Sequence, residues 1–282
     1  MTTSPTKLFA AAIALGLTCA LTCTTFAQDV KLARQHHPWA RFEPGAWKKV
    51  RVVTETLDEK GNVTSTSTTD TTTLLEYADA ETYSLQLEVT VDVAGKRFQT
   101  PPQYIEQGYF GELRGRNPIF RNVAMTNIDI EDQRIPCQVL EMEVLADDQK
   151  RVTKLYYSER VAPHLLKKES ISTDASGANT LYETMEAVVA LDMPQKVKDD
   201  LVPSSHVKTV RRNAKGTTIT IEVHSPAVPG GVVAHTSKEL DPKGRVIRRS
   251  TLELVDFGLD EDRQDVVRRR HNKRSAKAAR RG

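Results

Sequence analysis

The sequence contains few cysteines and few aromatic residues. Of its 282 residues, three are Cys, two are Trp and 6% are aromatic. Cys19 and Cys23 lie in the N-terminal leader described below, so Cys137 has no partner for an intrachain disulfide once the leader is removed. About 255 residues then remain, which is enough to bury a core without covalent cross-links. A disulfide-stabilised scaffold is therefore excluded.

The patterns of common catalytic and metal sites are also absent from the sequence. It contains no nucleophile elbow, no paired-histidine zinc helix and no CxxC pair. Ser205 and Lys208 match the Ser-x-x-Lys spacing of acyl-serine enzymes, but on a strand that spacing places them on opposite faces. We therefore predict no catalytic residue, no cofactor and no metal, and rank a hydrolase without a recognisable motif third among the functions.

The first 27 residues have the pattern of a secretory signal peptide. Lys7 supplies the positive charge, Leu8–Leu21 the apolar stretch, and Thr25-Phe26-Ala27 a small-x-small cleavage site. The pattern predicts an exported mature chain that begins at Gln28, in the periplasm or outside the cell. The alternative is a lipoprotein acylated on one of the two leader cysteines, although neither follows the usual small residue.

Charge is distributed unevenly along the chain. Of the 40 basic residues, eight lie in 266–282 and one is Lys7, so 28–265 carries 31 basic against 37 acidic residues, a net charge of −6. We expect 259–282 to form a basic tail, disordered or helical. Through Arg268–Arg281 the tail would attract an anionic membrane surface or an acidic polysaccharide, and no specific nucleic acid is expected.

Between leader and tail the sequence has the pattern of β-hairpins. Four segments have Asp or Asn first and Gly fourth, as in type I hairpin turns: Asp58–Gly61, Asp174–Gly177, Asn213–Gly216 and Asp241–Gly244. Leu85–Val93 alternates strictly between apolar and polar residues, as a half-buried strand does. The sequence therefore predicts a mainly β protein: a curved antiparallel sheet or open barrel built of successive β-meanders.

One stretch of the chain recurs 67 positions later. Ser158–Val188 aligns with Ser225–Val255 without a gap, and Asp174 and Gly177 fall on Asp241 and Gly244. This predicts an internal duplication of a four-strand unit. The alternative is that unrelated hairpins share the same turn and strand residues.

The repeat suggests boundaries within the mature chain. We expect 28–192 to form a first β-meander region, entered by an irregular arm over Gln28–Gly45. We expect 193–205, which contains Pro194 and Pro203, to be a linker with one helical turn. The second meander would then span 206–258 and pack with the first.

The longest irregular connection expected is Gln107–Asn122. Its candidate ligand-binding residues are Tyr109, Phe110, Arg114, Arg116, Phe120 and Arg121. The aromatic rings offer flat apolar area, and the forked guanidinium groups suit phosphate or carboxylate. The alternative is that the rings fold back to plug the end of the sheet while the arginines stay in solvent.

Three short motifs point to a known type of protein. They are Trp39-x-x-Phe42-x-x-Gly45-x-Trp47, Leu155-Tyr156-Tyr157-Ser158 with Val161-x-Pro163, and Val228-Pro229-Gly230. With them the chain resembles uncharacterised secreted, β-rich proteins of bacterial cell envelopes. At the level of fold it is similar to lipoprotein-carrier (LolA-like) half-barrels, in which a curved sheet covers an apolar cavity.

The function expected from these features is that of an exported, non-catalytic envelope protein. Its ligand would be apolar or lipid-like and would lie on the concave face of the sheet. The alternative is a structural or interaction protein attached to anionic envelope polymers through its basic tail.

Overall fold

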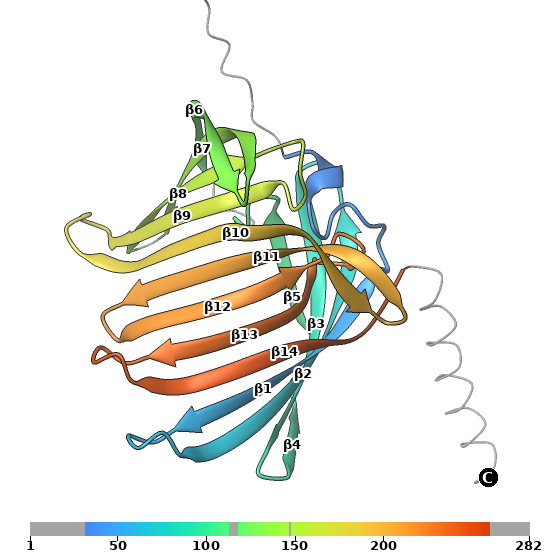
Figure 1. Cartoon of the computed structure of the whole chain (residues 1–282), viewed down its shortest axis with the longest axis vertical. Helices are drawn as coiled ribbons and strands as arrows, with labels where there is room; N and C mark the ends of the chain where they lie inside the picture. The colour runs from blue at the N-terminus through green and yellow to red at the C-terminus, as the bar shows by residue number, and fades with distance from the viewer. Residues whose placement is uncertain (1–31, 113–117, 147, 260–282) are drawn as a thin grey trace, which may run out of the picture.

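The computed structural model describes residues 32–112, 118–146 and 148–259, which form one antiparallel sheet of 14 strands (Figure 1). The elements are η1 (Arg34–His36), β1 (Trp47–Leu57), β2 (Val63–Ala78), β3 (Thr82–Val93), β4 (Lys96–Gln99), β5 (Gln103–Gly108), β6 (Ile119–Ile130), β7 (Gln133–Ala146), β8 (Gln149–Tyr157), β9 (Leu165–Asp174), β10 (Thr180–Val197), β11 (Asp200–Asn213), β12 (Gly216–His224), β13 (Val232–Leu240) and β14 (Val246–Gly258). Apart from the short 3-10 turn η1, these described residues contain no helix.

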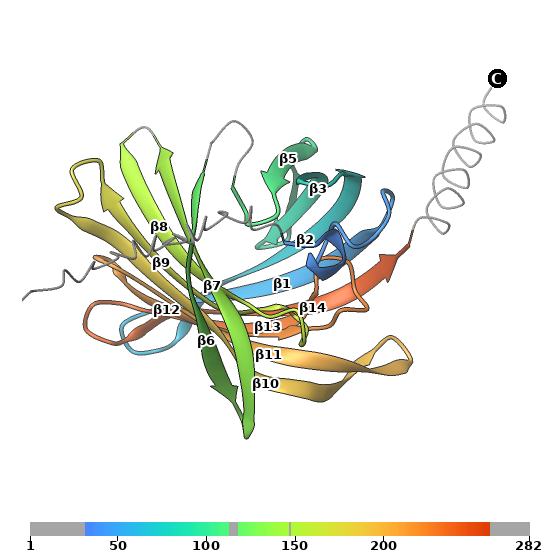
Figure 2. The same ribbon diagram turned by 90° about the horizontal axis from the view of Figure 1, so that it is seen from above.

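The strands follow one another across the sheet, except at one junction. Their order is β4-β3-β2-β1-β14-β13-β12-β11-β10-β9-β8-β7-β6. β5 also pairs with β3, along Thr82–Leu87, whereas β4 pairs along Thr90–Val93. β1 and β14, from the two ends of the chain, pair from Trp47↔Gly258 to Thr56↔Arg248. The sheet twists and curves strongly without closing (Figure 2). The predicted β-meander architecture is confirmed, and it takes the open form.

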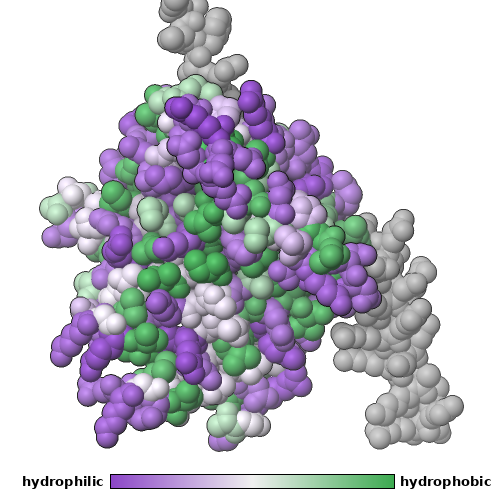
Figure 3. All heavy atoms as spheres, viewed as in Figure 1, coloured by the Kyte–Doolittle hydropathy of each residue, from purple (hydrophilic) through white to green (hydrophobic). Residues whose placement is uncertain are grey.

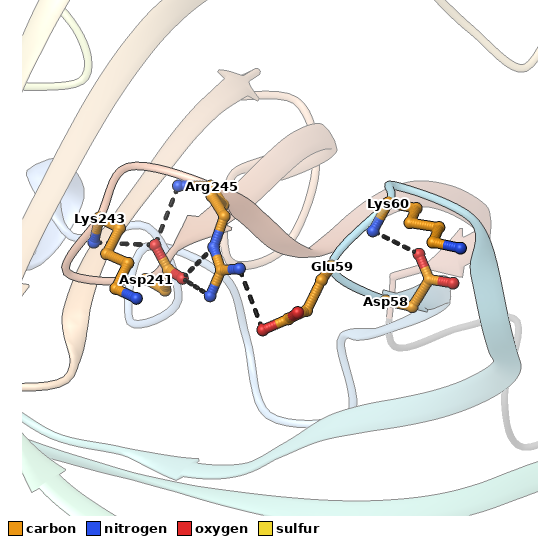
Figure 4. A network of polar contacts seen from close by, with 6 residues as sticks. All are labelled: Asp58, Glu59, Lys60, Asp241, Lys243 and Arg245. Carbon is orange, nitrogen blue, oxygen red and sulfur yellow. Dashed lines mark hydrogen bonds and ion pairs between the residues drawn. The ribbon is translucent and has the colours of Figure 1, made fainter.

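An ion-pair network joins the outer ends of the two hairpins beside this junction (Figure 4). Each turn begins with an Asp whose side chain accepts the backbone N–H two residues further on. These residues are Asp58 in the β1–β2 turn and Asp241 in the β13–β14 turn. Arg245 pairs with Asp241 at 2.7 Å and with Glu59 of the other turn at 3.1 Å. Exposed ion pairs contribute only about 0–1 kcal/mol each. The network therefore aligns the two turns more than it stabilises them.

The predicted repeat is present in the backbone. Shifted by 67 positions, the bounds of β7 and β8 fall on those of β11 and β12, and β9 falls on β13 to within one residue. The preceding turns also correspond, because Glu131 and Lys198 both have a left-handed φ, of 52° and 54°. The duplication thus extends further towards the N-terminus than the stretch found in the sequence.

The loops after the repeated strands have the same fold. In the β8–β9 loop the N–H of Ser158 donates to the carbonyl of His164 at 2.8 Å, and in the β12–β13 loop Ser225 donates to Gly231 at 2.8 Å. The last residue of each loop is left-handed, with φ of 68° at His164 and 73° at Gly231. A residue other than Gly pays a conformational cost there, so the first loop contains strain that the second avoids.

The expected linker at 193–205 is instead part of a hairpin. Met193–Val197 at the end of β10 pairs with Asp200–Ser204 at the start of β11, and Pro194 lies opposite Pro203. This tip extends beyond the residues of β9 and β12 that pair with the two strands. A proline removes a ladder hydrogen bond only where its nitrogen faces a partner strand. Beyond the ends of the neighbouring ladders both prolines are compatible with strands, and the predicted helical turn does not form.

The arm before β1 lies over the sheet and completes its core. Trp39 and Ala40 of the arm are buried in a cluster with Leu75, Met142 and Leu155 from the strands. Burying a large apolar side chain contributes about 1.5–3 kcal/mol, so the arm is part of the folded unit. Two further clusters surround Cys137 and Val228. On the face turned to the viewer in Figure 3, apolar patches alternate with polar side chains.

A matched pair of substitutions tests whether the repeats are energetically equivalent. The hydroxyls of Thr153 and Ser170 are 2.9 Å apart in the core, and those of the equivalent Thr220 and Ser237 are 3.0 Å apart at a half-buried site. Thr153→Val should lower the free energy of unfolding by about 1–3 kcal/mol, because Ser170 loses its partner where water is excluded. Thr220→Val should cost less, because water can reach Ser237 and replace the lost hydrogen bond. Equal costs in urea denaturation would contradict this expectation.

Candidate functional site

A pocket of about 130 Å³ lies between the arm and the two repeated loops. Its walls come from the arm, from the β8–β9 and β12–β13 loops, and from β10 and β11 beneath them. Its polar lining residues are His36, Arg41, His164, Glu186, Ser205, His224 and Ser225. The duplication therefore places two equivalent loops on either side of one small cavity, which the arm covers.

The arm is fixed to both loops. The N–H of Gly230 donates to the carbonyl of Pro38 at 2.9 Å, and a Cβ on Gly230 would come within 2.5 Å of the Trp39 indole. On the other side, the ring of His36 stacks on that of His164 at 3.8 Å and bonds the hydroxyl of Tyr157 at 2.5 Å. The geometry of the pocket consequently depends on the position of the arm.

His37 holds the turn of the arm together. Its Nδ1 accepts the backbone N–H groups of Trp39 and Ala40 at 3.2 and 2.9 Å. Its ring is 4% exposed, stacks on Tyr109 and lies beside Tyr83. Burial lowers the pKa of His37 to about 4, so the imidazole is neutral and its Nδ1 is free to accept. Of the two adjacent histidines, His36 therefore faces the pocket and His37 the core.

Charged side chains lie beside the pocket, with Lys48 buried and Glu222 and His224 half-buried. Glu222 Oε2 and His224 Nε2 are 2.8 Å apart. Lys48, 8% exposed, donates to the carbonyl of Val232 at 3.3 Å and lies 5.4 Å from the centre of the Trp39 ring. Burial lowers the pKa of Lys48 to about 8, against the opposing charge of Glu222. Burial also raises the pKa of Glu222, but the hydrogen bond from His224 and the charge of the nearby Lys48 act against it, and this pKa is lowered overall.

His235 belongs to the same cluster. It lies opposite Glu222 in the β12–β13 register, and its buried Nε2 has no hydrogen-bond partner among the described residues. Burial lowers the pKa of His235, and Glu222 acts against this. In the first repeat the positions of Glu222 and His224 are occupied by the buried Leu155 and Tyr157. Replacing core residues by charged ones is costly, so this cluster indicates a functional rather than a stabilising role.

A serine, a histidine and an acidic residue, the three residue types of a serine hydrolase, lie close together at the pocket wall. They do not form the hydrogen bonds that such an enzyme needs. Ser205 lies opposite His224 in the β11–β12 register, and His224 bonds Glu222. The hydroxyl of Ser205 donates to the carbonyl of Ala162 at 3.3 Å, however, and not to the imidazole. A nucleophilic serine needs its base within hydrogen-bonding distance. A hydrolase therefore gains no support from this arrangement.

Of the candidate residues predicted from sequence, those that the structure describes do not line this pocket. Tyr109 and Phe110 are buried in the core, and Phe110 packs on Phe120 with 5.0 Å between ring centres. Arg121 pairs with Glu141 and Glu143 at 3.3 and 3.6 Å. Arg114 and Arg116 lie outside the described residues. Ligand binding by this loop stays a prediction.

Two features are absent from the part of the chain that the structure describes. No three His, Cys, Asp or Glu side chains are grouped so that they could hold a metal ion. No helix has the length and apolarity needed to cross a membrane. The predicted signal peptide and basic tail lie outside these residues.

Comparison with known proteins yields distant structural likenesses only. No family model matches the chain, and no curated protein matches it. One similar crystal structure is of a candidate exported protein with a YmcC-like fold from Bacteroides fragilis: 9% identity, 77% of this chain and 97% of that chain covered, TM-score 0.30. Another is of a candidate lipoprotein from Parabacteroides distasonis: 12% identity, 82% and 100% covered, TM-score 0.31. At these TM-scores neither likeness carries an argument, and the similarity to LolA-like carriers stays a prediction.

The anchoring role of His37 makes a prediction about pH. The unfolded chain takes up a proton near pH 6.5, whereas the folded protein takes it up near pH 4. Stability should therefore fall as the pH drops from 6.5 to 4, by roughly 3 kcal/mol from this group at about 1.4 kcal/mol per pKa unit. His37→Asn keeps an acceptor that does not titrate, and other groups titrate alike in both proteins. The same pH dependence in urea denaturation of both proteins would refute the assignment.

The close contact at Gly230 makes a second prediction. Gly230 and Gly61 both have a left-handed φ, of 71° and 82°, but a Cβ meets the Trp39 ring only at Gly230. Gly61→Ala should cost about 1–2 kcal/mol for the backbone conformation alone. Gly230→Ala should cost roughly 1–3 kcal/mol more, because Trp39 must move. Denaturation and tryptophan fluorescence measure both effects, and an unchanged emission spectrum in Gly230→Ala would count against the contact.

Proposed function

We propose that this chain is an exported, non-catalytic binding protein that holds a small anionic ligand in the pocket between the arm and the repeated loops. The observation that carries the proposal is the unpaired guanidinium of Arg41. No ion pair joins Arg41 to any carboxylate of the described residues, and its recorded contact is with the Phe42 ring, 5.7 Å from its centre. Arg41 lines the same pocket as His164, and its charge contributes to lowering the pKa of that imidazole.

The size of the pocket favours a small ligand. Pockets for drug-sized molecules typically measure about 300–1,000 Å³, several times this volume. The neighbouring row on the same face of the sheet is also polar, and consists of Thr209, Thr220, Ser237, Ser250 and Thr54. A lipid chain would have to lie on these hydroxyls. A lipid-like ligand on the concave face therefore has less support than a small anion.

Two features outside the described residues complete the proposal. The signal-peptide pattern of residues 1–27 supports export. The eight basic residues of 266–282, with no acidic residue among them, support attachment to an anionic membrane surface or acidic polysaccharide. Attachment through the tail and binding in the pocket are compatible, since they use different parts of the chain.

Substitution of Arg41 tests the proposal. Calorimetric titration of the purified protein with small carboxylates and inorganic phosphate should reveal a ligand. Arg41→Ala should weaken binding by about 10–100-fold, because a hydrogen bond to a charged group contributes about 1.5–3 kcal/mol. Arg97→Ala on the exposed edge strand β4 is the control and should leave the affinity unchanged. Equal affinities in wild type and Arg41→Ala would refute the site, as would the absence of binding by any of these anions.

A further inference from the structure

We propose that the pocket selects small carboxylates that carry hydrogen-bond donors, hydroxyl or amine, on the carbons next to the carboxylate. The inference rests on the binding function proposed above and identifies the class of ligand. Two histidines in the wall are held so that each presents a bare nitrogen, which can only accept. The ligand must therefore bring donors as well as a negative charge.

The first bare nitrogen is Nε2 of His164. Nδ1 of this ring lies 3.0 Å from the carbonyl oxygen of Ser158. A carbonyl oxygen only accepts, so Nδ1 carries the proton and a neutral ring leaves Nε2 without one. Burial lowers the pKa of His164 in spite of the Ser158 bond, the charge of Arg41 acts in the same direction, and the neutral ring is favoured.

The second bare nitrogen is Nδ1 of His224. Nε2 of this ring lies 2.8 Å from the carboxylate of Glu222, which can only accept when ionised, so the proton of the neutral ring is on Nε2. Nδ1 lies close to Gly231, another residue of the pocket wall, at 3.5 Å from where a Cβ would stand on that glycine. Because Gly231 has no side chain, no side chain of this residue covers Nδ1.

The remaining polar groups of the wall leave acceptors in excess. Glu186 adds a carboxylate, which accepts, and the hydroxyl of Ser205 already donates to Ala162. Ser225 Oγ accepts the N–H of Ala227 and can itself donate one proton, against the acceptors of Glu186 and the two histidines. Arg41 supplies the unpaired cation. A ligand without donors would remove water from these acceptors and leave them unsatisfied, which costs more than a hydrogen bond contributes. Such a site rejects the analogue that lacks the donor more strongly than an apolar site rejects an extra group.

The class of ligand is tested with four small probes on the wild-type protein: glycerate, serine, propionate and glycerol. Glycerate or serine should bind at least tenfold more tightly than propionate, which has the carboxylate but no donors, and than glycerol, which has donors but no charge. Preference for glycerate or for serine distinguishes a hydroxyl from an amine as the donor. If propionate binds as tightly as glycerate and serine, and this binding is lost in Arg41→Ala, the inference about donors is overturned but the proposed binding function stands. If none of the carboxylates or phosphate binds, both proposals fail.

The protonation sites can be measured without any ligand. Two-bond ¹⁵N–¹H spectra of the labelled protein at neutral pH should show the proton of His164 on Nδ1 and that of His224 on Nε2, assigned with His164→Gln and His224→Gln. A proton on the other nitrogen of either ring, or on both, would overturn the inference.

Glu222→Gln provides a further readout. Where its NH2 group rather than its oxygen faces Nε2 of His224, the proton moves to Nδ1, which the same ¹⁵N–¹H spectrum detects. Glycerate should then bind at least tenfold more weakly, with propionate little changed. Equal losses for both would count against the selective role of His224.

Discussion

The pairing of β1 with β14 is the contact on which the single sheet depends. Among the described residues every other neighbouring pair of strands on the main path is consecutive in the chain and forms through a local hairpin. β1 and β14 instead lie about two hundred residues apart, so their pairing closes the whole chain at a large cost in entropy. Without it the first hairpins would be a separate sheet with no second layer. Lys48 on β1 would then lose its place beside Glu222, and the buried cluster would not exist.

The arm provides the second long-range constraint. An open sheet has no interior of its own, and here Trp39 and Ala40 supply part of the missing layer. The same segment carries His36 and Arg41 to the pocket. The binding site and the core are therefore built from one piece of chain, which explains why the contact with Gly230 is so close. A pocket of this kind is preorganised by packing, which lowers the ordering cost of binding.

The parts of the fold that were predictable from sequence are those that local physics determines. Asp58–Gly61 and Asp241–Gly244 form turns because Asp accepts the turn N–H groups and Gly accepts a positive φ. The prediction of a linker at 193–205 is wrong, because prolines usually end strands. Only the pairing shows that these two lie where no neighbouring strand needs their nitrogens. Likewise, the open rather than closed form of the sheet depends on which strands lack neighbours, and no short pattern reports this.

The pocket was not predicted, because its residues come together through register and through the arm. Ser205 and His224 are far apart in sequence and directly opposite in the sheet. One signal was nevertheless present. Under the 67-residue offset, Leu155 and Tyr157 of the first repeat become Glu222 and His224. In a duplicated β unit both copies inherit the same inward positions, so a charge that replaces a core leucine marks the position where the copies have separated in role.

That separation gives the two halves complementary properties. The first repeat keeps an apolar core under its loop, with Leu155 and Tyr157 buried, and this holds the arm through the bond from Tyr157 to His36. The second repeat accepts the cost of partly burying Glu222 beside the buried Lys48 of β1, and through Glu222 it fixes the orientation of His224. A stable half can support a costly half because both belong to one continuous sheet. The pocket lies at their junction, where rigid walls from one copy meet oriented polar groups from the other.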